Sequence, residues 1–230
     1  MIQSAADNPS ATLNSFCLDD LATFKREKSF PTGDSPDFRV FYVGRDDVHG
    51  VLVYLLSRAS RSVKMNMFGY DDEQLNDIIE KLVSNNHVYV QGTLDKSQAG
   101  GVHEKKILET WSPEMRSSFA IGQSATHQIS HTKGGVLDGL VAFEGSTNWS
   151  ASGEGSIVEG VKRKAQNNTL VVYTQSVEIA LFGAELDEEH TVALHQSNPD
   201  HFKVSDASQA EYDKAREAAR AEYDANRKSL

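Results

Sequence analysis

Several features that would define a protein class are missing from this chain. Cys17 is its single cysteine, which excludes an internal disulfide and a metal site built from several thiolates. No run of about 18 apolar residues occurs, so no membrane-spanning helix is expected. The N-terminal part lacks a basic stretch followed by an apolar one, so we expect no secretory signal and a cytoplasmic location.

Positive charge is scarce as well. The 230 residues include 23 Lys and Arg against 33 Asp and Glu, which gives a formal net charge of −10. Proteins that wrap DNA or lie on anionic membranes usually have the opposite balance, so a phosphate-bearing ligand would need a local basic patch. Without a basic amphipathic helix, stable membrane insertion is not expected either. The length fits one sizeable α/β domain with appendages.

Strand-like and helix-like segments alternate through the first half of the chain. Strands are predicted at 38–43, 62–68, 88–92 and 170–173, and helices at 48–59, from Asp71 or Asp72 to 83, and after Ser176. This alternation favours βαβ units and an α/β fold with a mixed, largely parallel sheet flanked by helices. Residues 1–37 are predicted to be a disposable extension, 38–205 the main domain, and 206–230 a peripheral C-terminal helix.

The residues with the clearest chemistry lie together between positions 131 and 148. The segment begins with His131-Thr132-Lys133, continues to Asp138 and ends in Gly145-Ser146-Thr147-Asn148. Short strands with tight turns are predicted at 129–133, 136–138 and 140–143. On the first of these, His131 and Lys133 would project from the same face and point together at one anion.

Each of these residue types has a role in phosphodiester chemistry. A lysine supplies charge to a phosphate, and the Ser146 hydroxyl and Asn148 amide supply oriented hydrogen bonds. Histidine can attack phosphorus as a nucleophile and, when protonated, can act as a general acid. One imidazole cannot do both in the same step, whereas two histidines on opposite sides of the phosphorus can.

The spacing HxK, four residues, Asp, six residues, GSxN resembles the HKD motif of the phospholipase D superfamily. In that superfamily two motifs meet, one histidine forms a phosphohistidine intermediate and the other protonates the leaving oxygen, with no metal or other cofactor required. The resemblance implies catalytic roles for His131, Lys133, Asn148 and Asp138, the last mostly structural in the family. It implies phosphate binding by Lys133, Ser146 and Asn148, and a phospholipase D-like domain over residues 38–205.

The motif occurs only once in this chain, and a single motif builds half a site. The resemblance therefore implies a homodimer in which His131 of both chains faces one phosphate. We expect an endonuclease acting on DNA or RNA, since the short single-motif members resemble nucleases. Two alternatives stay open: a phospholipase D-type hydrolase or phosphatidyltransferase acting on phospholipids, and a non-catalytic module that binds phosphate or nucleic acid.

One position departs from the family pattern. Small single-motif members often carry a glutamate shortly before the strand that corresponds to 170–173, where it orients the nucleophilic histidine. Asn168 stands there in this sequence. Its amide can accept a hydrogen bond from an imidazole but cannot neutralise an imidazolium. Glu154 or Glu159, in the loop after Asn148, is a further candidate for the group that orients His131.

Other residues have both a functional and an ordinary interpretation. Trp149 could stack on a base or pack in the core. The basic run 162–164 could contact a phosphate backbone or belong to a polar loop. His127, four residues before His131, is expected to line a pocket or lie on the surface rather than bind a metal. The acidic run 187–190 is expected to be a solvated face.

Overall fold

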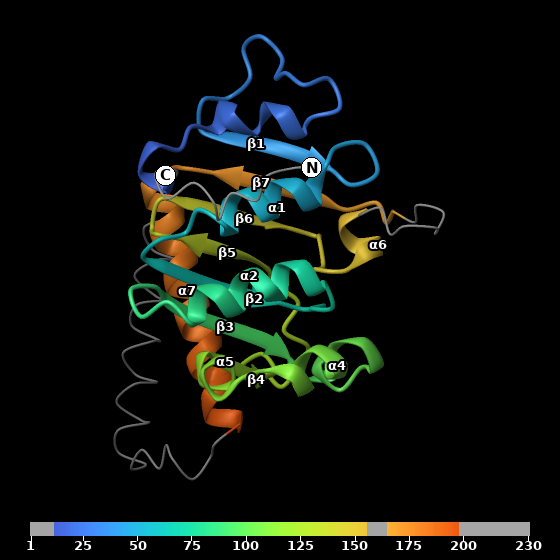
Figure 1. Ribbon diagram of the computed structural model, residues 1–230, viewed down its shortest axis with the longest axis vertical. Helices are drawn as coiled ribbons and strands as arrows, with labels where there is room; N and C mark the ends of the chain where they lie inside the picture. The colour runs from blue at the N-terminus through green and yellow to red at the C-terminus, as the bar shows by residue number, and fades with distance from the viewer. Residues whose placement is uncertain (1–11, 156–164, 198–230) are drawn as a thin grey trace, which may run out of the picture. The chain divides into compact units, whose positions relative to one another are not determined.

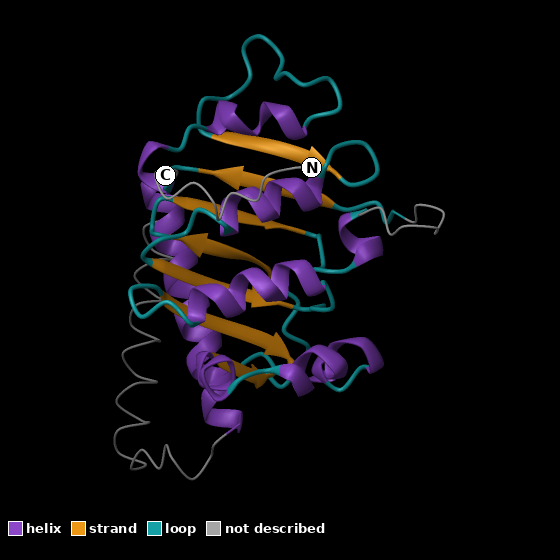
Figure 2. Cartoon of the chain, viewed as in Figure 1, coloured by secondary structure: helices purple, strands orange, loops and turns teal. Residues whose placement is uncertain are grey.

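The computed structural model describes residues 12–155 and 165–197 and contains a seven-stranded sheet flanked by helices (Figures 1 and 2). Strand order across the sheet is β1-β7-β6-β5-β2-β3-β4. The strands are β1 Phe38–Tyr42, β2 Ser62–Met67, β3 Tyr89–Asp95, β4 Phe119–Gly122, β5 Lys133–Leu137, β6 Val141–Gly145 and β7 Thr169–Tyr173. The helices are α1 Val48–Leu56, α2 Glu73–Val83, α3 Lys96–Ala99, α4 Val102–Thr110, α5 Pro113–Ser118, α6 Ala151–Glu154 and α7 Ser176–Ser197, after two 3₁₀ helices, η2 Leu13–Ser15 and η3 Leu18–Phe24. The predicted C-terminal helix at 206–230 lies outside the described residues, as do Glu159 and the basic run 162–164.

The sheet is mixed, as predicted, but less parallel than expected. Among the described strands, β2–β3 and β3–β4 pair parallel, whereas β2–β5, β5–β6, β6–β7 and β1–β7 pair antiparallel. The βαβ pattern that suggested parallel strands covers only the first part of the chain. After β4 the chain returns to the middle of the sheet, where β5, β6 and β7 lie next to one another and pair antiparallel. The parallel share of the sheet was therefore overestimated.

Two helical layers cover the two faces of this sheet. Helices α1 and α2 lie over one face and α7 runs across the other (Figure 1). Asp47 caps α1 by accepting from the Gly50 N–H, and Asp72 caps α2 by accepting from the Leu75 N–H, as their positions before apolar helical patterns predict. The main core lies under α1 and α2, and a smaller apolar cluster of Val136, Ala142, Ile179 and Leu186 lies under α7.

The acidic run on α7 packs on the sheet instead of forming the solvated face that we predicted. Asp187 accepts from the Lys64 ammonium at 2.7 Å, and the His190 Nδ1 lies 3.0 Å from the carbonyl oxygen of Gly92. Strands β2 and β3 present polar side chains at alternate positions toward this helix, so polar residues of α7 find partners there. The prediction was wrong because a local charge run does not reveal a polar strand face elsewhere in the sequence.

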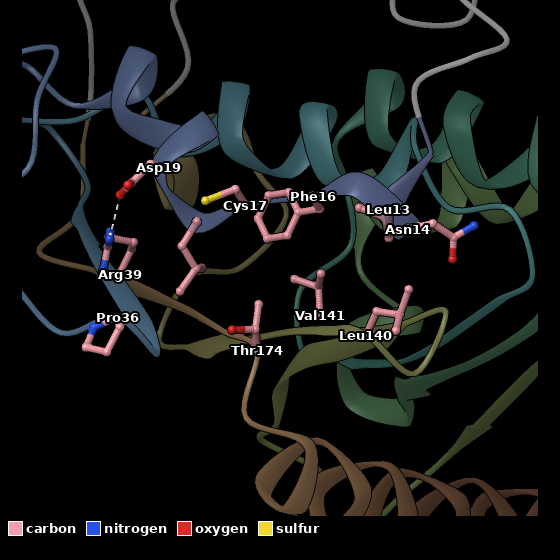
Figure 3. A pocket seen from close by; sticks show the side chains of 11 residues that line it. Leu13, Asn14, Phe16, Cys17, Asp19, Pro36, Arg39, Leu140, Val141 and Thr174 are labelled. Atoms are coloured by element: carbon pink, nitrogen blue, oxygen red, sulfur yellow. Dashed lines mark hydrogen bonds and ion pairs between the residues drawn. The ribbon is translucent and has the colours of Figure 1, made fainter.

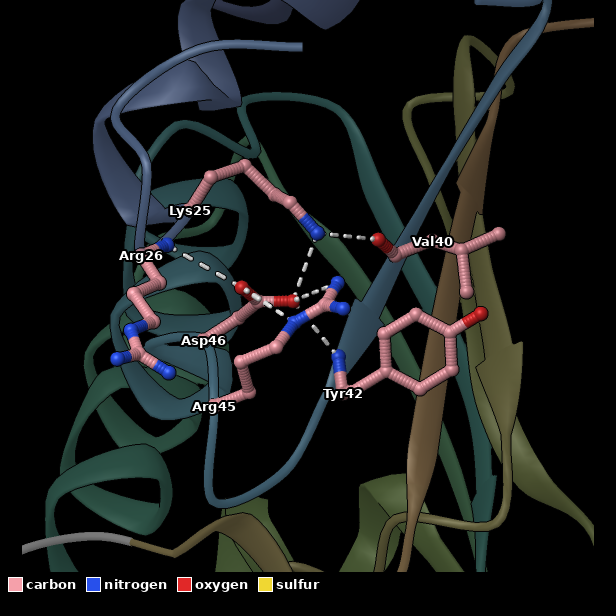
Figure 4. Close-up of polar contacts among 6 residues, drawn as sticks. All are labelled: Lys25, Arg26, Val40, Tyr42, Arg45 and Asp46. Carbon is pink, nitrogen blue, oxygen red and sulfur yellow. Dashed lines mark hydrogen bonds and ion pairs between the residues drawn. The ribbon is translucent and has the colours of Figure 1, made fainter. Parts of the chain in front are cut away.

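The described part of the predicted N-terminal extension is built into the domain. Leu13, Leu18 and Leu21 are buried within the main core. The buried carboxylate of Asp46 fastens the following segment, because it accepts from the Lys25 ammonium at 2.7 Å (Figure 4). These contacts contradict the idea of a disposable extension for residues 12–37.

Asp46 joins this segment to β1 and is held ionised by its partners. Besides Lys25, it accepts from the backbone N–H of Arg26 at 3.2 Å and of Tyr42 at 2.9 Å (Figure 4). Burial opposes ionisation, but the hydrogen bonds from Lys25, Tyr42 and Arg26 outweigh it and lower the pKa of Asp46. A charged Asp46 is therefore part of the folded state.

A pocket of about 490 Å³ lies between the 3₁₀ helices and the sheet (Figure 3). Its lining includes Leu140 and Val141, which stand just after the turn between β5 and β6. The pocket is therefore at the other end of β5 from Lys133 and does not coincide with the candidate site. The remaining lining residues are Leu13, Asn14, Phe16, Cys17, Leu18, Asp19, Pro36, Arg39 and Thr174.

Candidate functional site

The segment 131–148 folds as a β-hairpin that brings its two ends together. Strands β5 and β6 pair antiparallel, from Gly134 opposite Glu144 to Leu137 opposite Val141. The closed end is the Asp138-Gly139 turn, where both residues have positive φ, 56° and 67°, a conformation that suits Asp-Gly in hairpin turns. The HxK residues and the GSxN residues therefore stand side by side at the open end.

His131 lies in a loop before β5 and not on a strand, which corrects the predicted strand at 129–133. Strand β5 begins at Lys133, the residue paired with Met67 at the end of β2. Before that point β2 offers no partner, and the backbone N–H of Ser130 is bonded instead to the Asp95 carboxylate at 2.6 Å. Strand alternation therefore does not bring His131 and Lys133 together.

Phe68 brings His131 and Lys133 together instead. The His131 ring packs against the Phe68 ring with centroids 4.6 Å apart and planes at 66°, and the Lys133 ammonium lies 4.8 Å from the same ring centroid. Lys133 also donates to the carbonyl oxygen of His131 at 2.7 Å. Burial lowers the pKa of Lys133 to about 8, although the nearby charge of Asp95 opposes the shift. The ammonium is thus held in a sparsely solvated place, where it would interact strongly with an anion.

Gly69, the next residue along the chain, contacts the other half of the motif. Its N–H donates to the Asn148 Oδ1 at 3.3 Å, and its carbonyl accepts from the Trp149 N–H at 3.0 Å. A Cβ at this position would lie 3.1 Å from the Asn148 side chain, so glycine permits the close approach. The Phe68-Gly69 dipeptide therefore touches both halves of the motif.

The Gly-Ser turn is fixed by β7. A Cβ on Gly145 would lie 2.2 Å from the carbonyl oxygen of Thr169, so no other residue fits there without a backbone shift. The Ser146 Oγ accepts from the Thr169 N–H at 3.0 Å, and Thr147 donates to the Thr169 carbonyl at 3.0 Å. Ser146 is exposed, and its hydroxyl, which accepts from Thr169, keeps its own proton for a further hydrogen bond.

A polar network that we did not predict holds the residues on both sides of His131. Glu189 on α7 accepts from the Thr132 hydroxyl at 2.7 Å and from the Asn66 amide at 2.5 Å. The same Asn66 amide donates to the Ser130 hydroxyl at 2.9 Å, and Asn66 is fully buried. The sequence signal that could have indicated this network is the alternation of Ser62, Lys64 and Asn66 with apolar residues along β2, because buried amides need partners.

Asp138 lies at the closed end of the hairpin, away from His131. Its carboxylate accepts from the backbone N–H groups of Ser60, Arg61 and Ser62 and from the Ser60 hydroxyl, at 2.8 to 3.1 Å. It fastens the hairpin turn to the start of β2. The catalytic role expected for Asp138 is therefore not supported by its position, whereas its structural role is explained by these contacts.

Of the three candidates for orienting His131, Asn168 and Glu154 lie in the described part of the chain, and their hydrogen bonds go to other groups. The Asn168 amide donates to the Gly153 carbonyl at 3.0 Å. Glu154, which is 1% exposed, is hydrogen-bonded to the His49 ring of α1. Burial raises the pKa of Glu154 to about 7, and the hydrogen bond to His49 opposes this shift. In the described part of the chain, both groups hold α6 in place and do not act on the motif histidine.

Two further residues with open interpretations can be placed. Trp149 is 1% exposed and stacks on Tyr70 with ring centroids 5.4 Å apart, so it is a core residue and is not available to stack on a base. His127 is exposed, at a position with φ of 58°. The expected surface location of His127 is confirmed.

The chain resembles known proteins both in sequence and in structure. A family model described as "Cardiolipin synthase, PLD-like domain" matches residues 52–181, more than half of the chain. A search of curated proteins finds no significant match. Within the described ranges, no helix is long and apolar enough to cross a membrane.

Solved structures of the same fold include proteins of similar domain size. The chain resembles Nuc, a phospholipase D family member from Salmonella typhimurium, with 14% identity and a TM-score of 0.51 over 66% of this chain and 92% of Nuc. It resembles NucT from Helicobacter pylori with 17% identity and a TM-score of 0.53, over 66% of this chain and 94% of NucT. It also resembles phosphatidylserine synthase from Haemophilus influenzae, with 12% identity and a TM-score of 0.51, over 74% of this chain and 39% of that one.

The match of the family model and the shared fold agree with the spacing of the hairpin residues. The chain therefore belongs to the phospholipase D superfamily, through a PLD-like domain that contains the His131–Asn148 hairpin.

Proposed function

We propose that this protein is a metal-independent phosphodiesterase that cleaves nucleic acids as an endonuclease, in a site shared by two chains. The observation that carries the proposal is the meeting of both motif halves at Phe68-Gly69. His131 and Lys133 pack on Phe68, and Asn148 is hydrogen-bonded to Gly69. This places an imidazole, an ammonium and an amide at one end of the sheet, the set that a phosphodiester requires.

The reaction proceeds in two balanced steps. In the first, an imidazole nitrogen of His131 attacks phosphorus and the bond between phosphorus and the leaving oxygen breaks. The leaving oxygen takes a proton from the second imidazole. In the second step that imidazole removes a proton from water, which attacks phosphorus and releases His131. Lys133 stabilises the charge on the non-bridging oxygens, and Ser146 and Asn148 hold them by hydrogen bonds.

The second imidazole comes from another copy of the chain. The sequence contains one HxK…GSxN segment, so a chain by itself has a nucleophile and no separate general acid of this kind. A twofold axis beside the open end of the hairpin would set two His131 rings on opposite sides of one phosphate.

We favour nucleic acid as the substrate because this chain aligns with nearly the whole length of Nuc and NucT. The chain covers 92% of Nuc and 94% of NucT but only 39% of phosphatidylserine synthase, so it matches the short architecture. The resemblance to the small nuclease-like branch extends from the spacing of the motif to this architecture.

Chemistry and substrate are tested together with labelled oligonucleotides, a plasmid and phospholipid vesicles, all in EDTA. We expect cleavage of the nucleic acid and its loss in His131→Ala. His127→Ala is the matched control, since His127 is an exposed histidine four residues away, and it should keep full activity. Hydrolysis of phospholipid alone would replace the nuclease proposal with the lipase alternative. Nucleic-acid binding that survives His131→Ala without any turnover would indicate a binding module.

The shared site is tested by mixing subunits. If each site needs two His131 rings, an equal mixture of wild-type and His131→Ala chains that exchange freely retains about a quarter of the wild-type activity, because only wild-type pairs are active. Independent chains would retain about half. A monomer by sedimentation with full activity would refute the shared site.

A further inference from the structure

We propose that His49, Asp72 and Glu154 bind one divalent transition-metal ion, such as Zn²⁺ or Mn²⁺, at the base of the turn that carries Asn148. Each residue offers a ligand atom, and these atoms lie within 4.8 Å of one another. The three residues come from three segments that are far apart in the sequence. This site goes beyond the proposed function, because no step of the phosphodiesterase reaction uses it.

Each ligand is placed by its own secondary structure. His49 is in the first turn of α1, two residues after the cap residue Asp47. Asp72 caps α2 with one oxygen, Oδ1, which accepts from the Leu75 N–H at 2.8 Å, and its other oxygen lies 3.5 Å from the His49 Nδ1. Glu154 ends α6, the short helix that follows the GSxN turn. The positions are therefore set by helix ends and do not depend on flexible loops.

The His49 ring is oriented as a ligand. Its Nε2 is hydrogen-bonded to the Gln74 Oε1 at 3.0 Å, a contact that requires a proton on Nε2. Nδ1 then faces the carboxylates of Glu154 and Asp72. A nitrogen lone pair directed at two carboxylates is repulsive unless a cation, either a proton or a metal ion, lies between them. Carbonyl partners on the distal nitrogen are typical of histidines that bind metals.

Glu154 supplies a second observation that points to a cation. The residue is 1% exposed, and within the described residues its Oε1 is buried with no hydrogen-bond partner. A single proton on His49 satisfies only Oε2 of Glu154 and leaves its buried Oε1 without a partner among the described residues. Buried charges in proteins are usually paired or coordinate metals, so a divalent ion would compensate this site more fully.

The donor set indicates the class of ion. One imidazole nitrogen and two carboxylate oxygens suit Zn²⁺ and Mn²⁺, whereas Mg²⁺ and Ca²⁺ prefer oxygen alone. Three protein ligands leave a further position for water. The ion would join α1, α2 and α6. Helix α6 packs closely against the motif, since a Cβ on its residue Gly153 would lie 2.4 Å from the Asn148 carbonyl oxygen. Its effect on the motif would be to stiffen the Asn148 turn.

The test measures metal binding directly on the full chain after chelation and buffer exchange. Calorimetry with ZnCl₂, MnCl₂ and MgCl₂ should show one Zn²⁺ or Mn²⁺ site per chain, with weaker or no binding of Mg²⁺. Asp72→Asn keeps the helix cap and removes the charge, and Glu154→Gln keeps the shape. Each should weaken binding by at least about tenfold. Losses of this size occur even when the replaced residue only hydrogen-bonds to a metal ligand. Asp47→Asn makes the same substitution at a neighbouring helix cap that lacks a ligand role, and it should bind as the wild type does.

The outcomes separate this proposal from a simple ion pair and from the proposed function. At one fixed metal concentration, the melting temperature of the wild type and of Asp47→Asn should rise more than that of Asp72→Asn. No saturable binding, or binding unchanged in both Asp72→Asn and Glu154→Gln, would overturn the proposal and leave a protonated His49–Glu154 pair. His131→Ala should bind metal normally, so loss of nuclease activity does not bear on this test.

Discussion

Replacement of Asp138 separates a structural from a catalytic role within the motif. In Asp138→Ala the carboxylate that accepts from four donors disappears, and the Ser60 hydroxyl and the backbone N–H groups of Ser60, Arg61 and Ser62 lose their acceptor. Asp138 is 9% exposed, so water replaces these bonds poorly. The substitution also puts alanine at a φ of 56°, a conformation that favours Gly, Asn and Asp.

The magnitude follows from these contacts. A buried donor left without a partner costs about 1–3 kcal/mol, and such costs are not additive for donors that share one acceptor. Alanine in the left-handed region adds about 1–2 kcal/mol. We therefore expect Asp138→Ala to lower the free energy of unfolding by about 3–6 kcal/mol, a large part of the stability of an ordinary domain. Asp138→Asn keeps one acceptor oxygen and suits the positive φ, so it should cost about 1–3 kcal/mol.

Urea denaturation followed by circular dichroism measures the loss of stability, and turnover is measured at a temperature where each variant is folded. We expect kcat of the folded Asp138→Asn to stay within about threefold of the wild type, because the carboxylate is at the far end of β5 from His131. A loss of activity comparable to that of His131→Ala, with stability unchanged, would show that this account of Asp138 is mistaken.

Three further predictions concern other described contacts. Because the pKa of Lys133 is lowered to about 8 by burial, its positive charge is lost as pH rises through that value, and kcat/KM should fall about tenfold per pH unit above it. Lys133→Arg, whose side chain stays charged, should remove the contribution of Lys133 to this fall at high pH; a pH profile identical to that of the wild type would contradict the assignment. Glu189→Ala should lower kcat about tenfold or more with little change in KM, because Thr132 and Asn66 lose the carboxylate that holds the segment around His131. Single-turnover kinetics would check this, and a change in KM alone would argue against positioning. Because its partners lower the pKa of Asp46, this residue stabilises the fold above the unfolded value of 3.8, and the contribution disappears as pH falls through the lower folded pKa. Asp46→Asn should therefore show a weaker acid dependence of the urea midpoint than the wild type, and equal slopes would count against the hydrogen bonds of Figure 4.

The helices and strands with strong local signals could be predicted from sequence. Asp47 and Asp72 stand before apolar helical patterns, and both cap helices in the structure. The strand predicted at 129–133 failed, because the position of a strand depends on where its neighbour ends, and β2 ends at Met67. Strand β4 was missed as well, since Phe119–Gly122 is too short to show alternation.

In the candidate site, too, some residues follow from a local pattern in the sequence and others depend on long-range packing. His131, Lys133, Ser146 and Asn148 follow from their spacing along eighteen residues, which a hairpin brings together. Glu189 could not be found in this way, because it is 123 residues from Asn66 and no local pattern links them. Contacts of that separation depend on how the helix α7 crosses the sheet, which is set by tertiary packing.

The β5–β6 hairpin also explains why the intervals in the motif are what they are. Antiparallel pairing fixes the sum of two paired residue numbers, as in Gly134 with Glu144 and Leu137 with Val141, and continuing this register sets Lys133 across from Gly145. The interval between HxK and GSxN is therefore set by the lengths of the two arms of the hairpin, strands β5 and β6. One residue inserted in a single arm would shift every later pair and turn the side chains to the opposite face. Equal insertions in both arms would keep the ends level, so related chains should vary this interval only in steps that lengthen both arms together.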